Sequence, residues 1–498
     1  MNINKYNSKK INIFLQKFIF FLKMNKIKRK GVFSVIGAFL FNLILGSYHI
    51  WPNLLKYYNV YIHDKNKNIK LNSKIELLFI PIFRLFYSIF IPIGIIISRK
   101  INIKKITIFS YILILISHII ILYTSSYLNI IISLILFGIS IGISSINLTV
   151  NAWLFFPIYR GLIFGFVSTG NALGNYLFDK LSEKLINPYN INIEKNSEQN
   201  KFIIDNFSFF LKIIICIYFL IGIISIILLS PWKKSMINGN NILKKNDKYI
   251  PLSDFELMDE RTNNNFDVVS INRNKSLPYN GYNKNEKIYD PLHSKPFLQL
   301  IFMFNLSTLF SSLKMYDFPD LKNKDFKNYI SFIYTITDIL FRFLWGGLLD
   351  IYDFKSLYLF SLYIQIGIYS TYYFIVDIKY FCVFYNFLEG VTFSCNFVME
   401  IFSYYKIFGV NNGGILFGIN KIFSSFTQFI IIFLINYLNK DSIYFLILCL
   451  FYSLTSMLSS IILCFIEVKK FDYDRYTNEK IKKRRFSTST DFSNEGNI

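Results

Sequence analysis

Apolar segments alternate with shorter polar segments along most of the chain. Each apolar segment is close to the ~20 residues that an α-helix needs to cross a bilayer. The pattern predicts an all-α membrane protein with twelve transmembrane helices in two six-helix bundles, the first over 31–230 and the second over 296–467. The segments lie at roughly 31–56, 76–98, 105–124, 127–150, 160–179 and 207–230, and at roughly 296–316, 328–349, 355–375, 379–402, 414–438 and 441–466.

Three polar regions flank and separate the predicted bundles. Residues 1–30 and 468–498 are basic, and residues 231–295 are rich in Asn, Lys, Asp and Ser without apolar periodicity. Such a composition is typical of disorder, so we expect a disordered linker and a disordered tail. Within the N-terminus, Ile11–Leu22 is too short to span a membrane. It is either an interfacial helix or the apolar part of a targeting signal.

Composition and charge agree with a membrane protein. Of the 498 residues, 53% are hydrophobic and 19% are aromatic, which is too apolar for a soluble chain of this size. The net charge of +23 is concentrated in the flanks of the apolar segments, such as Arg99–Lys105. Basic flanks face the cytosol and attract anionic lipid. We therefore expect cytosolic termini and contact with membrane lipid, and no nucleic-acid partner; plasma and organelle membranes both stay open.

The sequence offers little support for an enzyme. All five cysteines lie in apolar segments without a C-x-x-C pair, so we expect no disulfide framework and no metal site. Gly138–Gly142 (GISIG) matches the G-x-S-x-G pattern of serine hydrolases, but that pattern needs a strand, a turn and a histidine partner. Inside an apolar run, small residues instead let helices pack closely. No Walker, H-E-x-x-H or dinucleotide motif occurs, so we expect no cofactor.

Asp338 and Arg342 are the most informative residues of the chain. They lie in Tyr329–Leu349, an otherwise apolar segment that is long enough to cross a bilayer. An ionised side chain at membrane depth costs roughly 3 kcal/mol or more. The i,i+4 spacing places both side chains on one helix face, where they can neutralise each other. The pair is therefore a candidate substrate or proton site, although it could also only join two helices.

Other polar side chains inside the predicted spans are further candidates. Arg84, Glu389 and Lys421 must find a partner or face water, whereas asparagines often only bond neighbouring helices. His49 could change charge near neutral pH, and Pro52 should bend or end the first helix. The candidates for a substrate site, with Asp338 and Arg342, are Tyr48, His49, Asn53, Arg84, Asn151, Glu389 and Lys421.

Two groups of six spans resemble the major facilitator superfamily. The loop motif of that family is visible in Gly346–Lys355 (GGLLDIYDFK), and a degraded copy occupies Gly94–Arg99 (GIIISR), with Ser98 where the family has Asp. The resemblance implies a secondary transporter with two bundles around a central site. It also assigns gating roles to Gly346, Asp350 and Arg160.

Three segments are similar to the monocarboxylate transporters and oxalate/formate antiporters: Gly46–Pro52 (GSYHIWP), Asn151–Gly165 (NAWLFFPIYRGLIFG) and Phe408–Gly418 (FGVNNGGILFG). Asp338 and Arg342 match the Asp-x-x-x-Arg of the monocarboxylate transporters. The resemblance implies that Arg342 binds the substrate carboxylate and that Asp338 takes part in proton coupling. Lys421 lies about one turn before the second cation of the oxalate exchangers. One intramembrane cation would suit a monoanion, and two would better suit a dianion.

We therefore expect a proton-coupled transporter of a small monocarboxylate such as pyruvate or lactate, working by alternating access. One alternative is an amino-acid or small-metabolite carrier of the same fold, in which Glu389 would pair with the amine. Another is a membrane sensor or scaffold that transports nothing and signals through the linker at 231–295 and the tail.

Overall fold

The computed structural model describes residues 26–65, 73–123, 126–156, 159–189, 199–232, 289–313, 324–375, 378–437 and 442–466. All regular elements in these ranges are helices, and no strand occurs among them. The prediction of an all-α fold is therefore confirmed. The predictions for the first 25 residues, for most of the linker and for the tail lie outside the described residues.

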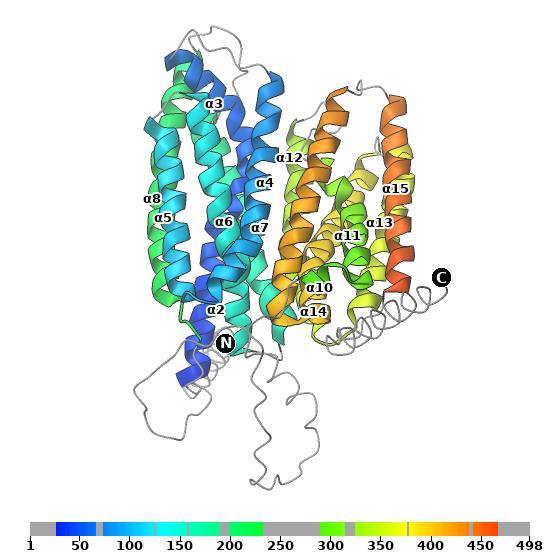
Figure 1. Ribbon diagram of the computed structural model, residues 1–498. Helices are drawn as coiled ribbons and strands as arrows, with labels where there is room; N and C mark the ends of the chain where they lie inside the picture. The colour runs from blue at the N-terminus through cyan, green and yellow to red at the C-terminus, as the bar shows by residue number, and fades with distance from the viewer. Residues whose placement is uncertain are drawn as a thin grey trace, which may run out of the picture.

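Two helical bundles stand side by side (Figure 1). The start of α2 and the end of α15 lie at the same, lower end in Figure 1, as an even number of crossings requires. The first bundle contains α2 (Lys26–Gly46), η1 (Ser47–Ile50), α3 (Trp51–Lys65), α4 (Ser73–Ser98), α5 (Ile103–Tyr123), α6 (Tyr127–Phe155), α7 (Arg160–Ile186) and α8 (Gln199–Leu228). The second contains α10 (Tyr289–Leu292), α11 (Lys295–Leu313), α12 (Lys324–Leu349), α13 (Phe354–Ile375), α14 (Lys379–Tyr437) and α15 (Ser442–Phe465).

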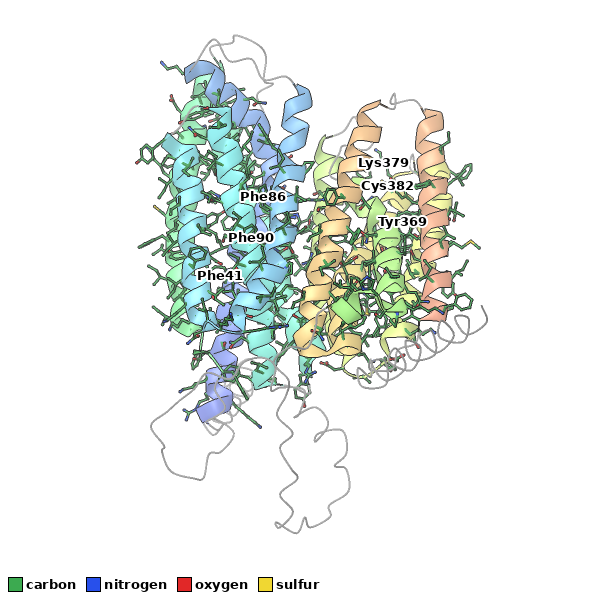
Figure 2. All side chains as sticks on the ribbon, viewed as in Figure 1. Phe41, Phe86, Phe90, Tyr369, Lys379 and Cys382 are labelled. Atoms are coloured by element: carbon green, nitrogen blue, oxygen red, sulfur yellow. The ribbon has the colours of Figure 1, made fainter. Side chains whose placement is uncertain are left out.

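These helices make twelve crossings. The first consists of α2, η1 and α3 together, and α14 supplies two, because its course is broken at Gly409 with φ 74° and ψ 177°. That backbone region is essentially confined to glycine. Figure 2 shows Lys379 and Cys382, near the start of α14, toward the upper end of the second bundle. Seven of the described helical segments are long and apolar enough to cross a membrane by themselves.

The outer surfaces of both bundles carry large apolar side chains. Phe109 of α5, Phe209 of α8 and Phe360 of α13 are 53%, 56% and 58% exposed. Figure 2 shows side chains projecting outward along both bundles. Exposed apolar surface on this scale is unfavourable in water and favourable against lipid tails. The chain is a multi-pass membrane protein.

The first crossing is interrupted where Pro52 predicts a break. Helix α2 ends at Gly46, a short 3-10 turn follows, and α3 begins at Trp51. Proline has no N–H to continue the hydrogen bonds of a helix. Gly46 also packs against the backbone carbonyl of Asn171 in α7, where a Cβ would clash. The break therefore places Tyr48 and His49 on a turn beside α7.

The interpretation of Gly138–Gly142 as a packing motif is confirmed. Gly138 and Gly142 in α6 face the backbone carbonyls of Phe83 and Tyr87 in α4, so that a Cβ at either position would collide with them. Between them, Ser140 is fully buried and its Oγ donates a hydrogen bond of 2.8 Å to the Ser110 carbonyl of α5. The serine therefore joins α6 to α5, while the two glycines pack against α4.

Under the transport function that the sequence resemblance implies, replacing Ser140 by alanine should leave uptake within about twofold of the wild-type rate. The change removes one hydrogen bond, worth about 1 kcal/mol of stability. Thermal unfolding in detergent and uptake into proteoliposomes measure the two effects. Complete loss of uptake by a folded Ser140→Ala protein would instead assign a chemical role to this hydroxyl.

At the lower end, α7 and α12 of opposite bundles touch through glycines. Gly161 of α7 and Gly346 of α12 each face the other's backbone carbonyl, and Gly165 faces the carbonyl of Arg342. A Cβ on any of the three would collide with backbone atoms. These glycines therefore allow the bundles to approach closely at this end.

A second contact between the bundles joins α4 to the part of α14 that follows Gly409. Gly418 faces Pro92, and Gly414 faces the side chain of Ile95. Both contacts lie on the last third of α4, toward the lower end. The α7–α12 and α4–α14 contacts together join the two bundles at this end.

Candidate functional site

Asp338 and Arg342 form a bidentate ion pair on α12. The Nε and Nη2 atoms of Arg342 donate to Oδ1 and Oδ2 of Asp338, each at 2.8 Å. Arg342 is 2% exposed and Asp338 is 5% exposed. A planar guanidinium matches the two oxygens of a carboxylate, and such charge-assisted pairs are stronger than neutral hydrogen bonds. The pair is fully formed within one helix.

The guanidinium also contacts the opposite bundle. Its Nη1 donates to the Ser168 carbonyl of α7 at 3.2 Å. On its other side, the Arg342 Cζ lies 4.2 Å from the ring centroid of Phe397 and 5.9 Å from that of Phe393, both on α14. An aromatic face stabilises a cation without neutralising it. Arg342 therefore sits at the interface of the two bundles, where a relative movement would change its surroundings.

The first bundle brings further predicted residues to this pair. Tyr48 lies within electrostatic range of Arg84, Arg342 and Asp338, and His49 lies within range of Arg84 and Arg342. The rings of Tyr48 and His49 lie 3.7 Å apart. Five of the predicted site residues, far apart in the sequence, thus form one group, which we call the central cluster: Tyr48, His49, Arg84, Asp338 and Arg342.

A second ion pair, which includes one residue that the sequence analysis missed, lies on α14. The Lys421 Nζ is 2.6 Å from Oε2 of Glu400. Oε1 of Glu400 accepts a hydrogen bond of 2.8 Å from Asn420, and Oδ1 of Asn420 accepts one of 2.9 Å from Asn305 on α11. Glu400 falls within the predicted span 379–402, so the rule that selected Glu389 would have found it. We call Glu400, Lys421, Asn420 and Asn305 the α14 cluster.

The remaining predicted residues lie elsewhere. Asn53 is exposed, and its Nδ2 donates to Asp179 at 3.2 Å. Asn151 joins three helix ends: it donates to Ser34 and to the Ser230 carbonyl, and its side-chain oxygen accepts from the Trp232 amide. This is a structural role at the lower end of the first bundle.

Glu389 is buried on α14 and 6% exposed. It interacts electrostatically with Tyr334 and Tyr369, and Tyr334 in turn interacts with Asp338. Figure 2 shows Tyr369 in the upper part of the second bundle. Tyr334 of α12 is thus within electrostatic range of both Glu389 and Asp338. Within the described residues, no group of His, Cys, Asp and Glu is arranged to hold a metal ion.

The residues for which the sequence predicts a gating role lie at the lower end. Asp350 follows α12, and its two carboxylate oxygens accept hydrogen bonds from the backbone N–H groups of Gly161 and Leu162, at 2.7 and 2.8 Å. These N–H groups begin α7 and have no partner inside the helix, so a carboxylate suits them. Burial raises the pKa of the Asp350 carboxyl, while the two N–H donors and Arg160 oppose that shift. Asp350 thereby ties the second bundle to the first.

The degraded copy of the loop motif, Gly94–Arg99, lacks the carboxylate that Asp350 provides in the intact copy. Ser98 stands where the family has Asp, and its Oγ donates to the Ile95 carbonyl of its own helix at 2.8 Å. The intact copy carries a second charged contact, because the Asp353 carboxylate lies 2.8 Å from the Lys406 Nζ. The carboxylate link between the bundles therefore comes from Asp350.

Solved structures with this arrangement of helices are major facilitator transporters. Two structures of XylE, a double-tryptophan mutant and the proton:xylose symporter bound to 6-bromo-6-deoxy-D-glucose, align with TM-scores of 0.63 and 0.60 at 12% and 11% identity. Each alignment covers 88% of this chain and 96% of the other. The chain has the major facilitator fold.

Two other major facilitator structures show the same correspondence. FucP in its outward conformation aligns with a TM-score of 0.53 and 14% identity over 87% of this chain and 99% of its own. The human organic anion transporter MFSD10 aligns with 0.51 and 12% identity over 88% and 100%. No family model and no curated protein matches the sequence. At these identities the likeness defines only the fold of this protein, and its substrate must be argued from its own residues.

Proposed function

We propose that this protein is a secondary transporter that moves a small monocarboxylate, of the size of pyruvate or lactate, together with a proton. The observation that carries the proposal is the buried, bidentate Asp338–Arg342 pair at the interface of the two bundles. Charged residues at such a depth are expensive and mark sites of transport in membrane proteins. Alternating access would come from movement of one bundle against the other around this pair.

The chemistry of the pair suits a carboxylate. Asp338 presents to Arg342 the same planar group that a monocarboxylate would present. When Asp338 binds a proton, its hold on the guanidinium weakens and a substrate carboxylate takes its place. A buried, unpaired guanidinium is unfavourable, so either Asp338 or the substrate must occupy it. This requirement couples the movement of the anion to that of a proton.

The lower end would act as the gate. There the Asp350 carboxylate holds the start of α7, and Gly161 and Gly346 bring the backbones together. We propose that this end faces the cytosol, because the basic segments of the chain flank the helix ends found there. Anionic lipid would then contact the basic residues of the same side.

Uptake of labelled pyruvate and lactate into proteoliposomes tests the proposal. An inward proton gradient should stimulate uptake several-fold, because protonation of Asp338 releases Arg342 on the outer side. Empty liposomes and liposomes with a collapsed gradient are the controls. No uptake by a monodisperse, folded protein would overturn the monocarboxylate assignment. Uptake of an amino acid that is lost in Glu389→Gln would then favour the amino-acid alternative.

A further inference from the structure

We propose that Glu400 determines the charge of the accepted substrate by neutralising Lys421, so that the site takes anions with one negative charge and rejects those with two. This inference deepens the proposed function and rests on it. The sequence predicts a partner for Arg342, namely Asp338, but none for Lys421. The structure adds Glu400 as the counter-ion of Lys421.

Glu400 is held firmly. Its Oε2 is 2.6 Å from the Lys421 Nζ, and its Oε1 accepts a hydrogen bond from Asn420, which is itself fixed by Asn305. The Glu400 side chain is 4% exposed, whereas that of Lys421 is 20% exposed. The carboxylate is thus the buried, anchored partner, and the lysine is the more exposed of the two.

The α14 cluster lies next to the central cluster. Phe397, whose ring covers Arg342, precedes Glu400 by about one helical turn. From the first bundle, Tyr87 of α4 lies within electrostatic range of Glu400 and Arg84, and its ring centroid is 6.5 Å from that of Tyr48. Tyr48 in turn lies within electrostatic range of Arg342. Both ion pairs therefore belong to one charged region between the bundles.

Each of the two pairs, Asp338–Arg342 and Glu400–Lys421, combines one negative and one positive charge. When a substrate carboxylate replaces Asp338 at Arg342, Lys421 remains neutralised by Glu400. A second carboxylate on the substrate would meet no free ammonium there and would be repelled by Glu400. Arg84 contributes a positive charge in wild type and in every variant below, so it does not affect their comparison.

Glu400→Gln tests this role, because glutamine keeps the side-chain shape and an oxygen that can accept from Asn420 but removes the negative charge. Uptake of labelled malonate and of labelled pyruvate is measured at neutral pH in proteoliposomes, and the ratio of the two rates is compared with wild type. We expect the malonate-to-pyruvate ratio to rise at least about tenfold, which corresponds to about 1.4 kcal/mol.

The double variant Glu400→Gln with Lys421→Met is the matched control. It removes the freed ammonium, so the ratio should return to the wild-type value. A purely structural role of the ion pair would lower both rates together and leave the ratio unchanged. Glu400→Ser, which also removes the negative charge, is made in parallel. The ratio can then be tested even if only one of the two single variants folds. If neither single variant folds and the double variant does, Glu400 serves stability and the inference is overturned.

The two proposals fail in distinguishable ways. Normal pyruvate uptake by the wild type with an unchanged ratio in folded Glu400→Gln overturns the role of Glu400 alone. A wild-type protein that takes up malonate as well as pyruvate also overturns it. No pyruvate uptake by the folded wild type overturns the proposed function, and the inference falls with it.

Discussion

Replacing Arg342 by alanine should lower gradient-stimulated pyruvate uptake by at least about a hundredfold. The guanidinium supplies the two charge-assisted hydrogen bonds that a carboxylate needs, and an alanine supplies none. A hundredfold loss corresponds to about 2.8 kcal/mol, which is within the range for losing two such bonds. Initial rates in proteoliposomes, at equal amounts of inserted protein, measure the effect.

The same change removes the partner of a buried carboxylate. Breaking one side of a buried ion pair typically destabilises a protein by about 3–5 kcal/mol, so Arg342→Ala alone could lose activity through its fold. The double variant Asp338→Asn with Arg342→Ala leaves no unpaired charge and separates the two effects. It should unfold near the wild-type temperature and still lack uptake.

Lys180→Ala is the matched control for removing a cation. Lys180 forms an i,i+3 pair with Glu183 on α7, with a distance of 2.7 Å and a Lys180 side chain that is 31% exposed. Exposed pairs contribute about 1 kcal/mol or less, so uptake should stay near the wild-type rate. Normal uptake by Arg342→Ala would show that the substrate binds elsewhere.

Replacing Gly346 by alanine should lower transport at least about tenfold, whereas Gly347→Ala should change it less than about twofold. A Cβ at position 346 would collide with the backbone of Gly161 and lie 3.0 Å from the Cα of Gly165. The backbone of Gly161 can move away from the new Cβ only if the whole of α7 shifts. At position 347 the nearest atom is the Leu162 Cδ1 at 3.4 Å, the end of a flexible side chain.

The collision should also change the conformation of the protein. Gly346→Ala should favour states in which α7 and α12 are apart at the lower end, since the closed contact no longer fits. Spin labels on the exposed Tyr159 and Tyr352, in a background without native cysteines, report the distance between the two bundles at this end. A longer distance in Gly346→Ala, and an unchanged one in Gly347→Ala, is expected.

Two results would contradict this account of the gate. If both alanine variants transport at the wild-type rate, the α7–α12 contact is not needed for the cycle. If both fail equally with unchanged label distances, the substitutions act through helix stability and not through the fit between bundles.

The sequence determined the features that depend on local periodicity. The lengths of the apolar segments predicted the helices, since crossing a bilayer requires a fixed number of apolar residues. The i,i+4 spacing likewise predicted the contact between Asp338 and Arg342, because both side chains lie on one face of one helix. Pro52 predicted the break in the first crossing for an equally local reason.

Only the tertiary structure decided which distant residues meet. Lys421 pairs with Glu400 across the reversal at Gly409, and Asp350 binds backbone groups of α7 that lie 189 and 188 residues away. Such contacts depend on how each helix is rotated and how closely its neighbours approach. Sequence spacing defines which residues share a helix face, but the packing of the bundle decides what that face meets. For this reason the sequence predicted a partner for Arg342 but none for Lys421, and only the folded chain brings Glu400 to that lysine.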